Sequence, residues 1–122
     1  MAQINLSGKV SVVTGAAQGL GQAIAEGLAD VGATIAMCGL GAEALDAVAN
    51  TIRDKFGDAN ILSTECDISD ETATAAFIDA VISRFGRIDV LVNNAGLGCA
   101  AVRPDFMSNP VPIWQLDPKE WR

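Results

Sequence analysis

Three glycines in the segment Val12–Gly21 (VVTGAAQGLG) constrain the fold of this chain more than any other feature. They follow an apolar run typical of a β-strand and open a segment with helical periodicity, Gly19–Val31. In that context Gly15 permits a sharp turn, Gly19 lets the backbone approach a pyrophosphate, and Gly21 lets the helix pack closely on the strand. The exposed N–H groups and the positive end of the helix dipole favour a phosphate ligand. A glycine-rich turn that binds nothing is the alternative.

Strand-like and helix-like segments alternate along the chain up to residue 96. The predicted strands are Lys9–Val13, Thr34–Cys38, Asn60–Cys66 and Ile88–Val92, and the predicted helices are Gly19–Val31, Ala42–Phe56 and Asp70–Phe85. This order with short connections predicts an α/β fold, a Rossmann-like doubly wound parallel sheet with strand order 3-2-1-4. We expect one domain over residues 1–122. A ligand is expected beyond the carboxyl ends of the strands, where the chain reverses direction between strands 1 and 4.

Each predicted helix carries an apolar stripe that should face the sheet. The stripes are Leu20, Ile24, Leu28 and Val31 in the first helix, Leu45, Val48, Ile52 and Phe56 in the second, and Phe77, Val81 and Phe85 in the third. Ser69 or Asp70 is predicted to cap the amino end of the third helix.

Helical periodicity stops after Gly96. The remaining segment contains all four prolines and both tryptophans, which predicts a long loop over residues 97–117. A helix is predicted to start near Pro118, with Asp117 as its N-cap. Within the loop, Arg103–Trp114 is expected either to border a substrate with an apolar wall or to serve in packing or an oligomer contact.

Composition limits the chemistry available to the chain. There is no histidine, which excludes Ser-His and Cys-His dyads and histidine-ligated metal sites, and we predict no metal. The net charge of −7 argues against a nucleic-acid partner. Without a long apolar run or a signal-peptide pattern, we predict no membrane partner and a cytoplasmic protein. Cys38, Cys66 and Cys99 are expected to be reduced, buried thiols.

Two further polar motifs follow predicted strands. Asp67, in CDISD (66–70), lies just past the third strand, where its carboxylate would accept a hydrogen bond from an adenine amino group. A helix cap or a solvated charge is the alternative for this residue. NNAG (93–96) follows the fourth strand, and Ala95 and Gly96 leave room for a ribose there. A simple turn is the alternative for this motif.

Together these motifs resemble the short-chain dehydrogenase/reductase family. The resemblance covers residues 6–122 and rests on TGAAQGLG (14–21), CDISD (66–70), NNAG (93–96) and DPKEWR (117–122), in that order. It implies an NAD or NADP cofactor and hydride transfer between nicotinamide and a small-molecule carbonyl or alcohol substrate. It also implies a homo-oligomer, either a dimer or a tetramer.

The resemblance assigns cofactor contacts to particular residues. The pyrophosphate and ribose would lie along Gly15, Gln18, Gly19, Leu20 and Gly21, the adenine against Asp67 and Ile68, and the ribose side along Asn94, Ala95 and Gly96. Asn93 would mainly steady the central strand.

The position that discriminates NAD from NADP departs from the family pattern. An acidic side chain just past the second strand accepts from the ribose 2′-hydroxyl of NAD, and a basic one pairs with the 2′-phosphate of NADP. Here Gly39 takes the usual acidic position and Leu40 the usual basic one. Relatives that prefer NADP often carry Arg or Lys at the position of Gln18, so the sequence favours NAD.

The catalytic residues of the family have no counterpart in this sequence. Related enzymes use a Ser, a Tyr and a Lys four residues after the Tyr, assisted by an Asn, whereas this chain has no tyrosine. Its last residue, Arg122, precedes all of these positions, so we expect the cofactor-binding half of such an enzyme, inactive and poorly soluble alone because its fourth strand would be an exposed edge. A non-catalytic nucleotide-binding module is the alternative. A Tyr-x-x-x-Lys motif beyond Arg122 would decide for the enzyme.

Overall fold

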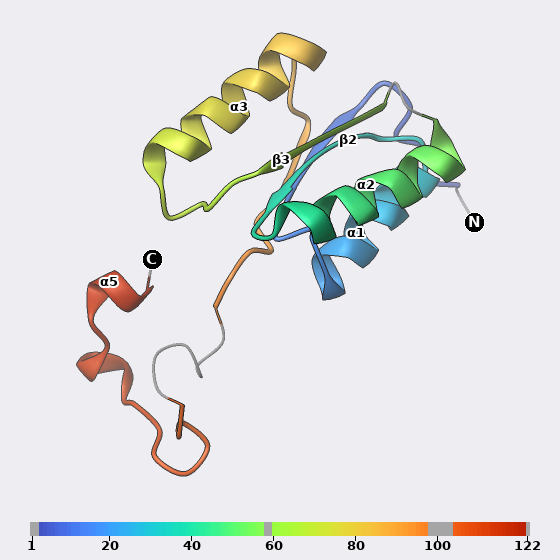
Figure 1. Ribbon diagram of the computed structural model, residues 1–122. Helices are drawn as coiled ribbons and strands as arrows, with labels where there is room; N and C mark the ends of the chain where they lie inside the picture. Colours follow the sequence, from blue (N-terminus) through green and yellow to red (C-terminus); the bar gives the residue numbers. More distant parts are fainter. Residues whose placement is uncertain (1–2, 58–59, 98–103, 122) are drawn as a thin grey trace.

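Four parallel strands form the centre of the molecule, and helices cover both faces of this sheet (Figure 1). The computed structural model describes residues 3–57, 60–97 and 104–121. The elements are β1 (Val10–Thr14), α1 (Gly19–Asp30), β2 (Thr34–Gly39), α2 (Ala42–Phe56), β3 (Ile61–Glu65), α3 (Glu71–Phe85), β4 (Val90–Val92), a 3₁₀ turn (Ile113–Gln115) and α5 (Pro118–Trp121). The predicted strands and helices are therefore confirmed to within two residues at each end.

The strand order is β3-β2-β1-β4, and each neighbouring pair is parallel. In the register, Val12 of β1 lies between Ala36 of β2 and Leu91 of β4. The predicted order and the Rossmann-like fold class are confirmed. Because β1 and β4 are neighbours although two other strands intervene in the sequence, the chain reverses its direction of growth between them, as a ligand site at this edge requires.

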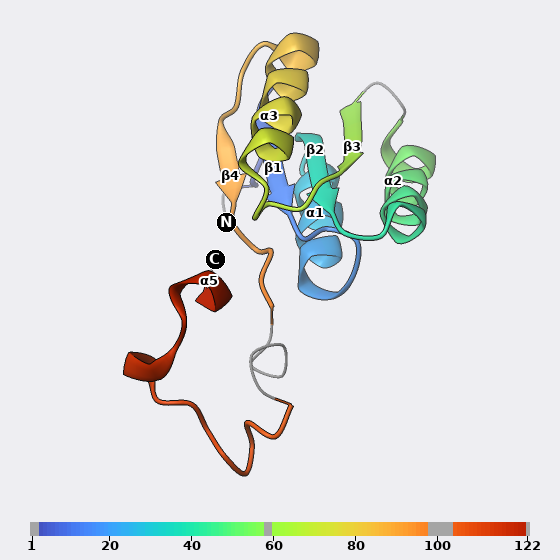
Figure 2. The same ribbon diagram turned by 60° about the vertical axis from the view of Figure 1, so that its left-hand side comes forward.

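The sheet separates two apolar layers. On one face, Val13, Ile35 and Met37 are buried beneath α1 and α2. On the other face, Val12 and Ala36 pack with buried side chains of α3, and Figure 2 shows this helix alone on its side of the sheet. Alternating side chains of one strand thus enter opposite layers, which explains why β1 is buried along its whole length.

The buried face of α1 differs from the predicted stripe. The residues that face the sheet are Gly21, Ala25 and Ala29, whereas Leu20 is 70% exposed and Ile24 and Leu28 are only partly buried. The small residues recur every four positions, so they form one strip along the helix and let its backbone approach the sheet. The larger side chains then pack at the margin of the contact. Size, rather than hydrophobicity, decides which face of this helix is buried.

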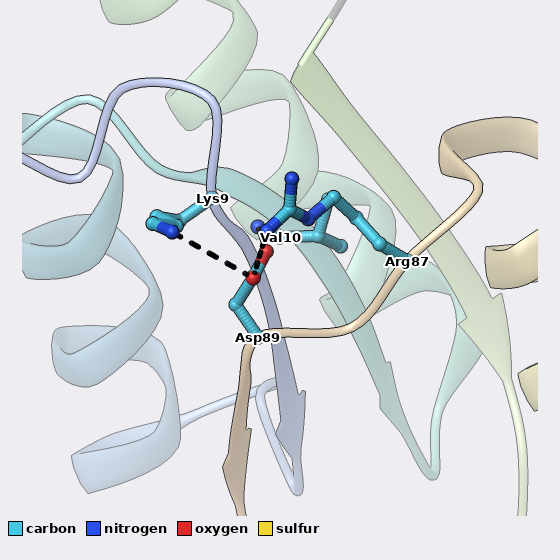
Figure 3. Close-up of polar contacts among 4 residues, drawn as sticks. All are labelled: Lys9, Val10, Arg87 and Asp89. Carbon is cyan, nitrogen blue, oxygen red and sulfur yellow. Dashed lines mark hydrogen bonds and ion pairs between the residues drawn. The ribbon is translucent and has the colours of Figure 1, made fainter.

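At the amino end of the sheet, Asp89 joins the chain before β4 to the start of β1 (Figure 3). Its Oδ2 accepts a hydrogen bond of 2.9 Å from the backbone N–H of Val10. Its Oδ1 accepts from the Arg87 guanidinium and lies 4.0 Å from Nζ of Lys9. The hydrogen bond from Arg87, and then that from Val10, hold the pKa of the Asp89 carboxyl below its ordinary value. This carboxylate fixes where β4 begins beside β1.

We predict that replacing Asp89 by Asn lowers the stability of the fold in a pH-dependent way. Because the pKa of Asp89 is lower in the folded than in the unfolded chain, the stabilisation is complete above about pH 4 and is lost as the pH falls through the folded value. Urea unfolding should show a lower midpoint for Asp89→Asn at pH 7, and the difference from the parent should shrink below about pH 4.

Asp46→Asn is the matched control, because Asp46 is an exposed carboxylate on α2. It should leave the midpoint nearly unchanged. If the urea midpoints of Asp89→Asn and the parent differed by the same amount at pH 3 and at pH 7, the stabilising role of the Asp89 carboxylate would be contradicted.

Candidate functional site at the carboxyl edge of the sheet

The motifs that the sequence analysis selected meet at the edge where the strands end (Figure 2). The glycine loop follows β1, Gly39 ends β2, Asp67 follows β3 and the NNAG motif follows β4. Backbone hydrogen bonds connect these segments: Ala16 N–H donates to the Cys38 carbonyl at 3.0 Å, and Cys66 N–H donates to the Gly39 carbonyl at 3.1 Å. The structure therefore brings together four segments that are far apart in the sequence.

A side chain is disfavoured at each of the three glycines in the loop after β1, but the structural reason differs from one glycine to the next. Gly15 and Gly19 have positive φ angles of 65° and 57°, which L side chains rarely adopt. Gly21 lies within α1, and a Cβ there would be 2.1 Å from the Gly15 carbonyl oxygen and 2.5 Å from Nδ2 of Asn94. A Cβ on Gly19, in contrast, would meet no atom within 4 Å. Gly15 and Gly21 are thus required by packing, while Gly19 leaves open space above the helix end.

Hydrogen bonds between Thr14 and Asn94 tie the end of β1 to the end of β4. The buried Thr14 Oγ1 accepts from the backbone N–H groups of Asn94 at 3.1 Å and of Ala95 at 3.0 Å. In return, Nδ2 of Asn94 donates to the carbonyl oxygens of Thr14 and Gly15, each at 3.2 Å. The loop after β4 is therefore held directly against the glycine loop.

The side chain that ties the segment after β4 to β1 is that of Asn94, and the strand-steadying role of Asn93 stays a prediction. Asn93 is exposed, and the hydrogen bonds to β1 and the glycine loop come from the side chain of Asn94. The sequence alone gives no signal for which of the two adjacent asparagines makes these hydrogen bonds. The assignment of Asn94 to the ribose side stays a prediction, although its Nδ2 is occupied by protein acceptors.

Asp67 and Asp70 take different roles in the CDISD motif. Asp70 caps α3: its Oδ1 accepts from the N–H groups of Thr72 at 2.9 Å and Ala73 at 3.1 Å. Asp67 Oδ1 accepts from the hydroxyl of Ser69 at 2.7 Å and from its backbone N–H at 2.9 Å, and these bonds lower the pKa of the Asp67 carboxyl. Asp67 is exposed at the sheet edge. The cap at Asp70 is confirmed, and Asp67 remains charged and open to a ligand.

Exposed apolar side chains surround the same edge. Leu20 at the start of α1, Leu40 after β2 and Ile68 after β3 are exposed by 70%, 60% and 44%. Gly39 ends β2 directly before Leu40, and a Cβ on it would be 3.3 Å from Cβ of Ala17. This edge therefore offers apolar contact surface, and no side chain at position 39 projects into it.

The residues present fit a dinucleotide with a pyrophosphate. Gln18 is the N-cap of α1 and makes no side-chain cap hydrogen bond, so the side chain leaves the N–H groups of the first turn to a ligand. A phosphate at this point would receive these N–H groups and the positive end of the helix dipole. The open space over Gly19 lets it approach, and Ala95 and Gly96 present little side chain on the neighbouring loop.

Beyond residue 97, the described part of the chain runs away from the sheet (Figure 1). It consists of turns, the 3₁₀ turn and α5, and Met107 and Trp114 are exposed by 85% and 82%. Asp117 Oδ1 accepts from the Lys119 N–H at 2.9 Å, as predicted for the cap of the last helix. Arg103 and Cys99 lie outside the described residues. A substrate-bordering role for Arg103–Trp114 stays a prediction.

Comparison with known proteins gives a family and several solved structures. Residues 9–122 match the family model described as short chain dehydrogenase. D-threitol dehydrogenase of Mycolicibacterium smegmatis is 46% identical over 92 residues, which are 75% of this chain and 35% of that protein.

Two solved structures show the same arrangement of elements. L-sorbose reductase from Gluconobacter frateurii, complexed with NADPH and L-sorbose, superposes with a TM-score of 0.75 at 39% identity, over 80% of this chain and 36% of the other. A short chain dehydrogenase/reductase from Burkholderia phymatum in complex with NAD gives a TM-score of 0.72 at 33% identity. The match covers 80% of this chain and 34% of the other. The chain thus spans about a third of the length of the proteins it matches.

We predict that Thr14→Val destabilises the protein by about 1–3 kcal/mol, because the Asn94 and Ala95 N–H groups lose their acceptor. Valine keeps the shape of threonine, so packing changes little. Thr14→Ser is the control and should retain most of the stability, since its hydroxyl can accept the same hydrogen bonds. Urea unfolding of the three proteins measures the effect. Equal stability of the Val and Ser variants would contradict the stabilising role of the hydrogen bonds that the Thr14 hydroxyl accepts.

We predict opposite effects of adding a methyl group at two glycines of α1. Gly21→Ala should cost about 1–3 kcal/mol, because its Cβ would overlap the Gly15 carbonyl oxygen. Gly27→Ala, at an exposed helix position with no atom within 4 Å of the new Cβ, should stabilise by about 0.5–1 kcal/mol. Thermal unfolding of both variants distinguishes close packing from helix propensity. If Gly21→Ala stabilised the protein, the close contact between position 21 and the Gly15 carbonyl oxygen would be contradicted.

Proposed function

The chain belongs to the short-chain dehydrogenase/reductase family, and from this premise we propose that it binds a nicotinamide dinucleotide at the carboxyl edge of its sheet. The protein then transfers hydride between the nicotinamide and a small-molecule carbonyl or alcohol substrate. The observation that carries the proposal is the glycine loop: an uncapped helix start beside open space at Gly19, held in place by the Thr14–Asn94 hydrogen bonds.

In the proposed complex, this chain's own groups bind and orient the dinucleotide. Backbone N–H groups at the start of α1, near Gln18, Gly19 and Leu20, hold the pyrophosphate. Asp67 and Ile68 contact the adenine, one by its carboxylate and the other by its exposed apolar surface. Ala95 and Gly96 border the ribose. The bound nicotinamide supplies the hydride or accepts it.

We assign no catalytic role within these residues. The family's acid–base chemistry uses a tyrosine, and this sequence contains none. The proposal therefore places the cofactor cradle here and the proton transfer on groups outside residues 1–122, in keeping with a match to about a third of each relative.

We further propose that the cofactor is NAD rather than NADP. Related structures hold either NADPH or NAD, so the family leaves the choice to local residues. The basic side chains of residues 3–57 and 60–97 are Lys9, Arg53, Lys55, Arg84 and Arg87. They precede β1 or β4 or end α2 and α3, at the edge opposite the proposed site. A 2′-phosphate would meet no cation from these ranges, and Glu65 and Asp67 would repel it.

The family resemblance supports a proposal for the location and the oligomeric state of the protein. In the described ranges, no helix is long and apolar enough to cross a bilayer. We propose a cytoplasmic homo-oligomer, a dimer or tetramer, that acts on a small molecule.

We predict that calorimetric titration gives a dissociation constant for NAD about tenfold or more below that for NADP, a difference of about 1.4 kcal/mol. Leu40→Arg should reduce the difference between the dissociation constants for NAD and NADP, because it adds a cation beside the expected position of the 2′-phosphate. Ile82→Arg is the control, because it adds the same charge at an exposed site on α3. Tighter binding of NADP by the parent protein, or an equal effect of both variants, would refute the NAD assignment.

A further inference from the structure

Glu65 lies beside Gly39 at the carboxyl ends of two neighbouring strands. In the parallel register, Gly39 of β2 pairs with Glu65 of β3, and the two strands lie side by side (Figure 2). Because neighbouring strands are about 4.8 Å apart, the Glu65 side chain begins one strand spacing from the backbone of Gly39. The residue without a side chain therefore has an acidic residue as its lateral neighbour.

Positions 39 and 65 face the same side of the sheet. Met37, two residues before Gly39, is buried in the layer beneath α1 and α2. Cys38 before Gly39 and Cys66 after Glu65 are free and buried, as predicted, and both belong to the opposite layer beneath α3. Since side chains alternate along an extended chain, the Cβ of Glu65 and a Cβ at position 39 point to the face that carries α1.

On that face, position 39 adjoins the glycine loop. A Cβ on Gly39 would be 3.3 Å from Cβ of Ala17 and 3.4 Å from its backbone nitrogen. These distances are tight, so a side chain from β2 would press on the loop that is proposed to hold the pyrophosphate. Glycine at position 39 keeps this space free of a β2 side chain and leaves it within reach of β3.

The Glu65 carboxylate is available to a ligand. Glu65 is exposed at the end of β3, and within the described ranges no residue forms a hydrogen bond or an ion pair with its carboxylate. Asp67 differs, because its Oδ1 already accepts two hydrogen bonds from Ser69. Glutamate is also longer than aspartate, which lets its carboxylate extend sideways over a neighbouring glycine.

We propose that Glu65 recognises the adenosine ribose, and that its carboxylate accepts a hydrogen bond from the 2′-hydroxyl of NAD above Gly39. In dinucleotide-binding folds this bond is made by an acidic residue just past the second strand, the position that Gly39 takes here. The neighbouring strand supplies the carboxylate instead, and the same charge repels the 2′-phosphate of NADP. This inference rests on the proposed function and deepens it, because it names the residue that selects the cofactor.

The test measures what the 2′-hydroxyl contributes to binding with and without the Glu65 carboxylate. Calorimetry on the whole protein compares NAD with an NAD analogue whose adenosine ribose is 2′-deoxy. The parent should bind NAD about tenfold more tightly than the analogue, because the analogue lacks a hydrogen bond to a charged group. Glu65→Ala should bind the two ligands equally. A partly unfolded variant would weaken both dissociation constants by the same factor, so their ratio still reports the contact.

Glu43→Ala is the matched control, because Glu43 is an exposed carboxylate in the first turn of α2, which follows β2 at the same edge. This variant should keep the tenfold ratio. The inference is overturned if the parent does not distinguish the two ligands, if the ratio persists in Glu65→Ala, or if both variants abolish it. Binding of neither ligand by the parent would remove the proposed function and this inference with it, whereas NAD binding with an unchanged ratio removes only the role of Glu65.

Discussion

The hydrogen-bonded joint between Thr14 and Asn94 is the contact on which the rest of the edge depends. The buried Thr14 hydroxyl accepts hydrogen bonds from two backbone N–H groups, and the Asn94 side-chain amide donates to two backbone carbonyls. The same amide nitrogen is the group that a Cβ on Gly21 would overlap. The joint thus fixes the separation of β1 from β4, and that separation leaves α1 room only for a glycine at its first turn. The same hydrogen bonds thus hold the segment after β4 against the glycine loop and limit how closely a side chain at position 21 of α1 could approach.

Topology and the glycine loop could be predicted from the sequence because both follow from local rules. Alternating strand and helix patterns leave few parallel topologies, and glycine spacing after a strand requires a particular turn. The buried face of α1 could not be predicted from hydrophobic periodicity, since the close contact selects the small residues Gly21, Ala25 and Ala29. Which of the two adjacent asparagines donates to β1 depends on the path of the backbone after β4, which a pair of identical residues does not reveal.

The carboxyl edge and the amino edge of the sheet carry different kinds of interaction. At the amino end, charged side chains hold β4 beside β1. Asp89 accepts hydrogen bonds from the Arg87 guanidinium and from the backbone N–H of Val10, which fixes where β4 begins. At the carboxyl end, backbone groups, the Thr14 hydroxyl and the Asn94 amide hold the loops together, and the exposed side chains there include the apolar Leu20, Leu40 and Ile68 as well as Asp67. An anion held there by backbone N–H groups would interact with fixed dipoles that need no counter-ion, so a net charge of −7 is compatible with the proposed dinucleotide site.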